Sequence, residues 1–161
     1  MDTVYIETSI VSHASAWPSK NPETGVLQDQ AKRWLAEHAP KYELVTSQFV
    51  IDEVSLGDPD AAADRLELLK EVRVLIPNAE VERVADEIIS RSLMPTKARL
   101  DALHVASAVV GRVKYLLTQN CRHIANATEL PNIYDLLEDL GFARPLICTP
   151  AEFLGDPDDD S

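Results

Sequence analysis

The segment DALHVASAVVGRVKYLLTQN, residues 101–120, contains a helical pattern that leads directly into a strand-type run. Apolar residues cover nearly the whole circumference of the predicted helix, residues 97–111, so we expect this helix to be buried. Tyr115–Thr118 is predicted to be the buried strand that follows it. A buried helix joined to a buried strand is typical of a parallel sheet wrapped by helices. The polar helix residues that then need a function or an internal partner are Asp101, His104 and Ser107.

The same alternation of strand-type and helical segments extends over the chain, which favours an α/β fold with a mostly parallel sheet of about five strands. The predicted strands are Thr3–Ile6, Glu43–Thr46, Val72–Ile76, Tyr115–Thr118 and Leu146–Cys148. The other predicted helices cover residues 26–35, 47–57, 58–69, 78–93 and 133–140, several of them with capping residues at their starts: Ser47, Asp58 followed by Pro59, and Asn78. Thr8 or Ser9 is expected to cap a helix after the first strand, and residues 17–25, WPSKNPETG, to form a loop.

Composition limits the classes of function. The chain has 161 residues and a net charge of −12, and four of the negative charges lie in the last six residues. We expect one domain over residues 1–150 and a disordered acidic tail over residues 151–161. The remaining charge of −8 argues against nucleic-acid binding by a broad basic surface, so any phosphate contact has to be local or supported by metal ions. With two cysteines and neither a signal-peptide pattern nor a membrane-length apolar run, we expect a soluble cytoplasmic protein.

Polar residues gather where the predicted strands end. Glu7 follows the first strand, Ser47 the second, and Thr118 and Asn120 the fourth. In an open parallel sheet, the carboxyl ends of the strands form the ligand crevice. Two further acids, Glu53 and Asp101, come from helices that flank it. Because clustered carboxylates repel unless a cation lies between them, and because Mg²⁺ and Mn²⁺ prefer oxygen ligands, these residues predict a divalent metal site.

The ordered motifs YIETS (5–9), E-x-x-x-G (53–57), DALHVASA (101–108) and YLLTQNCRHIANA (115–127) resemble those of the PIN-domain nucleases, in particular the VapC-like toxins of toxin–antitoxin pairs. The resemblance spans the chain to about residue 150. It implies an α/β/α sandwich and a Mg²⁺- or Mn²⁺-dependent endoribonuclease. The positions that match the family's metal ligands are Glu7, Glu53, Asp101 and Asn120, of which the three acids would be catalytic, with Ser9 and Thr118 as supporting residues.

Two of these positions depart from the family's usual aspartate. Glu7 is longer by one methylene, and Asn120 is uncharged, which leaves three acids where the family has four. The resemblance also implies three partners, namely an RNA substrate, a small antitoxin and a second copy of the chain. We expect no contact with a membrane.

Other interpretations of these residues stay open from the sequence. Glu7 also fits a simple cap of the helix that follows it, and Asp101 fits a first-turn acid of its own helix. Glu53 fits a solvated residue beside Asp52. His104 fits either a hydrogen-bonded core histidine or a partner of the site. Cys121 and His123 form a C-x-H pair, but two zinc ligands without a second pair make a poor zinc site. A catalytically weak or inactive PIN-like binding module is the alternative function, whereas a nucleotide-binding α/β domain lacks its glycine motifs.

Overall fold

The computed structural model describes residues 1–154. A five-stranded sheet runs through its centre, in the order β3-β2-β1-β4-β5, and each neighbouring pair is parallel. This architecture confirms the predicted α/β fold with about five strands. The sheet was expected to be mostly parallel, and all of its strand pairs are parallel. The strands are β1 (Thr3–Ile6), β2 (Glu43–Ser47), β3 (Arg73–Leu75), β4 (Tyr115–Leu117) and β5 (Leu146–Cys148).

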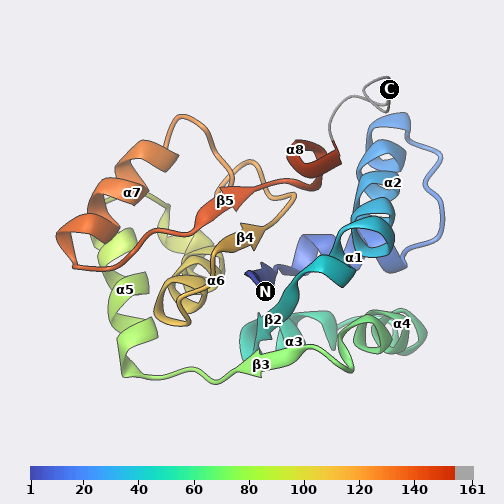
Figure 1. Ribbon diagram of the computed structural model, residues 1–161, viewed down its shortest axis with the longest axis horizontal. Helices are drawn as coiled ribbons and strands as arrows, with labels where there is room; N and C mark the ends of the chain where they lie inside the picture. The colour runs from blue at the N-terminus through green and yellow to red at the C-terminus, as the bar shows by residue number, and fades with distance from the viewer. Residues whose placement is uncertain (155–161) are drawn as a thin grey trace.

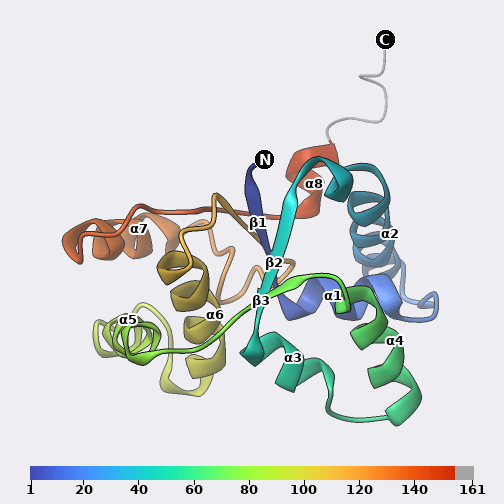
Figure 2. The same ribbon diagram turned by 60° about the horizontal axis from the view of Figure 1, so that its bottom comes forward.

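Helices cover both faces of the sheet (Figures 1 and 2). Figure 2 shows α5, α6 and α7 on one side of the sheet and α1, α2 and α4 on the other, with α3 below β2. The arrangement is the α/β/α sandwich that the sequence motifs imply. The helices are α1 (Thr8–Ser15), α2 (Pro22–Glu37), α3 (Gln48–Val54), α4 (Pro59–Leu69), α5 (Ala79–Ser90), α6 (Arg99–Val110), α7 (Leu130–Asp139) and α8 (Pro150–Leu154), and two short 3₁₀ turns lie at Ala39–Lys41 and Thr96–Ala98.

Helix α6 is the buried helix of the fold. All eight residues from Ala102 to Val109 are buried, which confirms the prediction from its all-round apolar pattern. The helix packs against α5, α3 and β4. Asp101 and His104 are therefore held on a helix that is fixed by packing on several sides.

The predicted caps of α3, α4 and α5 are confirmed by hydrogen bonds from backbone N–H groups to the side chains of Ser47, Asp58 and Asn78. The loop predicted over residues 17–25 is wrong in its second half, because α2 begins at Pro22. Asn21 caps this helix by accepting hydrogen bonds from the N–H groups of Glu23 and Thr24, and proline suits the first helical position. The sequence NP therefore marks a helix start here rather than a loop interior.

The end of the described chain is ordered by an aromatic cluster. Helix α8 includes residues 151–154, for which we expected disorder; residues 155–161 of the predicted tail lie outside the described residues. The Phe153 ring packs edge-on against Trp34, Tyr42 and Tyr115, with ring centroids 5.4 to 6.0 Å apart. These contacts tie α8 to α2 and β4. No helix among residues 1–154 is long and apolar enough to cross a membrane.

The aromatic cluster generates a stability prediction. Phe153→Ala removes the ring that closes the cluster, so we expect the free energy of unfolding to fall by about 2 to 3 kcal/mol, somewhat less than for a fully buried phenylalanine. Ile76→Ala is the control, because Ile76 is 73% exposed and an exposed truncation costs less than about 0.5 kcal/mol. Urea denaturation measures both, and equal unfolding midpoints for the two variants contradict the packing role of α8.

Candidate active site

The crevice of this sheet lies at the carboxyl ends of β1 and β4. The chain builds β1, β2 and β3 in one direction and then crosses back to place β4 on the other side of β1. Ligands bind at such a reversal of strand order in open α/β sheets. Glu7 follows β1 directly, and Thr118 follows β4, so both residues lie at this point.

Glu7 is a buried carboxylate with hydroxyl partners. Its side chain is only 4% exposed. One oxygen, Oε1, accepts a hydrogen bond from Thr118 Oγ1 at 2.6 Å and another from Ser9 Oγ. Glu7 occupies the N-cap position of α1 but makes no side-chain capping bond. The simple capping interpretation of Glu7 is therefore wrong, because the carboxylate is held by the hydroxyls of Ser9 and Thr118 instead.

Glu53 reaches the same place from α3. Its Oε1 atom accepts hydrogen bonds from Thr8 Oγ1 and from His104 Nε2, the latter at 3.1 Å. Burial opposes ionisation of Glu53, but the hydrogen bonds from His104 and Thr8 outweigh it and hold the pKa of this carboxyl below its ordinary value. We expected Thr8 or Ser9 to cap α1, but Glu7 occupies the N-cap position and the Thr8 hydroxyl donates to Glu53. The neighbouring Asp52 accepts from Gln48 on the exposed side of α3.

His104 joins these two acids. Oxygen atoms of Glu7 and Glu53 and a ring nitrogen of His104 lie within 4.8 Å of one another, and they form the one group of this kind found in residues 1–154. The His104 ring is fully buried, and its other nitrogen, Nδ1, is 2.9 Å from the hydroxyl of Tyr5. His104 is thus both a hydrogen-bonded core residue and a neighbour of the acids. Its spacing from Asp101 predicted the same helix face for both residues, but no sequence pattern indicated the contact between His104 and Glu53.

Asp101 belongs to an adjoining cluster. Its Oδ1 accepts a hydrogen bond from Asn120 Nδ2 at 3.1 Å, and its Oδ2 lies 2.9 Å from His123 Nδ1. Asn120 Oδ1 accepts from the backbone N–H of His123, and the backbone N–H of Asn120 donates to Thr118 Oγ1 at 2.9 Å. Asn120 therefore connects Asp101 to the hydroxyl that holds Glu7. Hydrogen bonds thus connect Glu7, Ser9, Thr118, Asn120 and Asp101, whereas Glu53 belongs to a separate set with Thr8 and His104 that lies beside Glu7.

The charge of this network favours a cation. The Glu7 and Glu53 carboxylates lie together and Asp101 adjoins them, yet no lysine or arginine of residues 1–154 forms an ion pair with any of the three. Hydroxyls, an amide and imidazoles are their partners instead. Carboxylates so placed are stabilised most simply by a shared hard divalent cation. The donor set therefore fits Mg²⁺ or Mn²⁺ by its chemistry.

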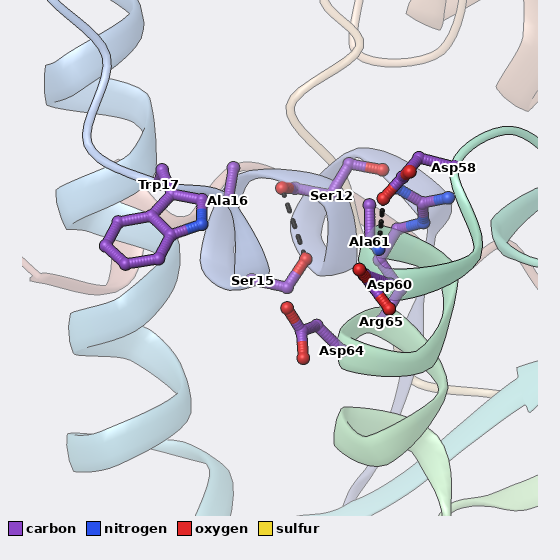
Figure 3. Close-up of a pocket in the computed structure, with 9 residues that line it drawn as sticks. All are labelled: Ser12, Ser15, Ala16, Trp17, Asp58, Asp60, Ala61, Asp64 and Arg65. Carbon is purple, nitrogen blue, oxygen red and sulfur yellow. Dashed lines mark hydrogen bonds between the residues drawn. The ribbon is translucent and has the colours of Figure 1, made fainter.

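Other candidate features lie apart from this network. Cys121 is exposed, and His123 is engaged with Asp101, so the C-x-H pair gains no further zinc ligands within the described residues. A pocket of about 420 Å³ between α1 and α4 is lined by acidic and hydroxyl side chains, with the Asp60 and Asp64 side chains on α4 near Ser15 on α1 (Figure 3). None of the predicted site residues lines it.

Comparison with known proteins places the fold. No family model and no curated protein matches the chain. Solved structures do match: VapC20 of Mycobacterium tuberculosis, described as a sarcin-ricin-loop-cleaving toxin, has a TM-score of 0.59 at 20% identity and covers 77% of this chain and 95% of its own. VapBC2 of Rickettsia felis, bound to a promoter DNA fragment, has a TM-score of 0.56 at 16% identity, covering 91% and 98%.

A toxin–antitoxin complex from Klebsiella pneumoniae has a TM-score of 0.58 at 15% identity and covers 92% of this chain and 98% of its own. The chain has the fold of VapC toxins.

The buried charge on Glu7 generates a prediction for the metal-free protein. Glu7→Gln removes one of two neighbouring negative charges while keeping the shape, so we expect it to raise the free energy of unfolding in EDTA by about 1 kcal/mol. Its partners are hydroxyls, which can reverse their hydrogen bonds to suit an amide. The exposed Glu71→Gln is the control. A clear loss of stability in Glu7→Gln, measured by urea denaturation, contradicts this picture of electrostatic repulsion.

Proposed function

We propose that the protein is a Mg²⁺- or Mn²⁺-dependent endoribonuclease that acts as the toxin of a toxin–antitoxin pair. The observation that carries the proposal is the group of uncompensated carboxylates at the switch point of a VapC-type sheet. The likeness to a toxin that cleaves the sarcin-ricin loop supports RNA as the substrate. Glu7, Glu53 and Asp101 would hold the ion, and Asn120 offers an amide oxygen beside them.

The chain's own residues prepare the site in three ways. Hydrogen bonds from Ser9 and Thr118 hold the Glu7 carboxylate. Thr8 and His104 hold Glu53 in the same way. Asn120 and His123 hold Asp101. When bound, the ion supplies positive charge for the phosphate oxygens and lowers the pKa of water. Because each acid is already held by hydrogen bonds, little side-chain ordering remains to be done when substrate arrives.

The acidic surface is consistent with this assignment. A protein with a net charge of −12 meets RNA unfavourably over most of its surface, so binding has to depend on a local cation. We infer that the partner protein is a small antitoxin that presents lysine or arginine to these carboxylates, as suits a neutralising inhibitor. The toxin–antitoxin complexes among the structural neighbours support such a partner.

We also propose that the protein forms a homodimer and acts in the cytoplasm.

A catalytically weak binding module is the second candidate, and Asn120 favours it. The amide carries no charge, and its oxygen already accepts a hydrogen bond from His123 N–H. Under this alternative, the network binds a partner or RNA without cleaving it.

The enzymatic proposal is tested by Asp101→Asn. We expect the purified protein to cleave RNA only with added Mg²⁺ or Mn²⁺, and Asp101→Asn to lose more than about 100-fold of the rate, because a ligand charge at the reacting centre is removed. Asp52→Asn, an exposed acid on α3, is the matched control and should keep full activity. Equal activity in the two variants would falsify the assignment of Asp101.

The role of Asn120 is tested by Asn120→Asp. The change replaces an N–H donor, 3.1 Å from Asp101, by a second carboxylate. We therefore expect a lower free energy of unfolding in EDTA and tighter Mn²⁺ binding by calorimetry, because the added charge repels Asp101 until a cation joins them. The alternative function predicts destabilisation without any gain in Mn²⁺ affinity.

A further inference from the structure

A chain of buried hydrogen bonds runs from the start of α3 to Glu53. Ser47 Oγ lies 2.6 Å from the Tyr5 hydroxyl, which lies 2.9 Å from His104 Nδ1, and His104 Nε2 lies 3.1 Å from Glu53 Oε1. Tyr5, Ser47 and His104 are each 0% exposed. They come from β1, the end of β2 and α6, the most deeply buried parts of the fold. These hydrogen bonds therefore link Glu53, whose side chain is 32% exposed, to three fully buried residues.

The direction of these hydrogen bonds follows from the groups at the two ends. An ionised Glu53 carboxylate only accepts, so His104 Nε2 must carry a hydrogen. In a neutral ring Nδ1 then accepts, and the Tyr5 hydroxyl is its donor. The Tyr5 hydroxyl has one hydrogen to donate, and Nδ1 is its acceptor at 2.9 Å.

The remaining groups continue in the same direction. The Ser47 hydroxyl donates to the Tyr5 oxygen, and Ser47 Oγ accepts from the Val50 N–H at 3.4 Å. Each of the two hydroxyls then donates one hydrogen bond and accepts one, and each ring nitrogen of His104 makes one.

We propose that Tyr5 and His104 are positioning residues that fix the Glu53 carboxylate for the divalent cation, with His104 as an Nε2–H donor and not as a metal ligand. This inference rests on the proposed metal-dependent function. Tyr5 and His104 act through Glu53.

Metal ligation by His104 is disfavoured by the same hydrogen bonds. A ligating Nε2 has to give up its hydrogen, which moves to Nδ1 and reverses the whole chain. Tyr5 then donates to Ser47, whose own hydroxyl hydrogen has no acceptor, because Ser47 Oγ has only Tyr5 and the Val50 N–H as partners in the described residues. Glu53 also loses a donor. A buried donor left unsatisfied is costly, so the Nε2–H form is the stable one.

The first test changes Tyr5 alone. Tyr5→Phe keeps the ring and removes the hydroxyl that fixes the His104 tautomer. We expect Mn²⁺ to bind about 10-fold more weakly by calorimetry at neutral pH, as is typical when a residue that orients a metal ligand is lost. Tyr134→Phe is the matched control: it removes a phenol hydroxyl that also has a partner, the Ile147 N–H, but on α7. Urea denaturation of both variants shows whether they stay folded.

The second test asks whether a donor at this position is enough. His104→Gln can place an amide N–H near Glu53, whereas His104→Leu fills similar space without a donor. We expect the glutamine variant to retain Mn²⁺ affinity within about 10-fold and the leucine variant to lose about 100-fold, the range found for residues that orient metal ligands. Equal losses in two folded variants contradict the donor role.

The third test reads the tautomer directly. The ¹⁵N chemical shifts of the His104 ring distinguish the Nε2–H from the Nδ1–H form. We expect the Nε2–H form in the metal-free protein and, unchanged, after Mg²⁺ is added. A switch to the Nδ1–H form with Mg²⁺ overturns the proposal, because it identifies Nε2 as a ligand.

The outcomes separate the two levels of inference. Wild-type protein that binds neither Mg²⁺ nor Mn²⁺ contradicts the proposed function and this inference together. Wild-type protein that binds Mn²⁺, with a Tyr5→Phe variant that binds as tightly as Tyr134→Phe, contradicts the positioning role alone and leaves the nuclease proposal standing.

Discussion

The burial of the Glu7 carboxylate at the end of β1 is the constraint that organises this end of the molecule. A carboxylate with 4% exposure needs hydrogen-bond donors, and the structure supplies them from two elements that are far apart in sequence, α1 and the segment after β4. Thr118 can reach Glu7 because β1 and β4 are neighbours in the sheet, whereas Ser9 lies only two residues further along the chain. The strand order that reverses at β1 and the polar lining of the crevice are therefore one arrangement.

Fixing Glu7 has consequences for the elements around it. Thr8 precedes Ser9 and donates to Glu53, so α1 holds both acids from adjacent residues. On the other side, Asn120 ties Asp101 to Thr118, so α6 is coupled to the same centre. A site built this way concentrates negative charge without any lysine or arginine counterion in the described part of the chain, which costs stability in the absence of a cation. That cost is the expected signature of a site arranged for a ligand rather than for folding.

The sequence predicted the framework better than the contacts within it. All five strands and the buried α6 follow from apolar periodicity, and the caps at Ser47, Asp58 and Asn78 follow from local chemistry. The sequence also predicted the positions of Glu7 after the first strand and of Glu53 and Asp101 on flanking helices. It did not predict that His104 would meet Glu53, because that contact depends on how α3 and α6 pack. The start of α2 at Pro22 was missed because Asn21, which caps the helix, was interpreted as part of a loop. The helix α8 was missed because Phe153 packs against aromatic residues from distant parts of the chain, whereas the sequence next to it is acidic.

Asn120 influences both the negative charge next to Asp101 and the hydrogen bonds that hold Asp101 in place. An aspartate there would put a fourth negative charge beside Asp101, whereas the amide donates to Asp101 and also accepts from the His123 backbone, so it orders the loop after β4 as well. Three acids still exceed the charge of a single divalent cation. The amide therefore lowers the repulsion in the metal-free protein while leaving enough negative charge to attract an ion. Under the proposed function, an amide in place of an aspartate at position 120 would attract a metal ion less strongly but would hold Asp101 in place, and these two effects would act on activity in opposite directions.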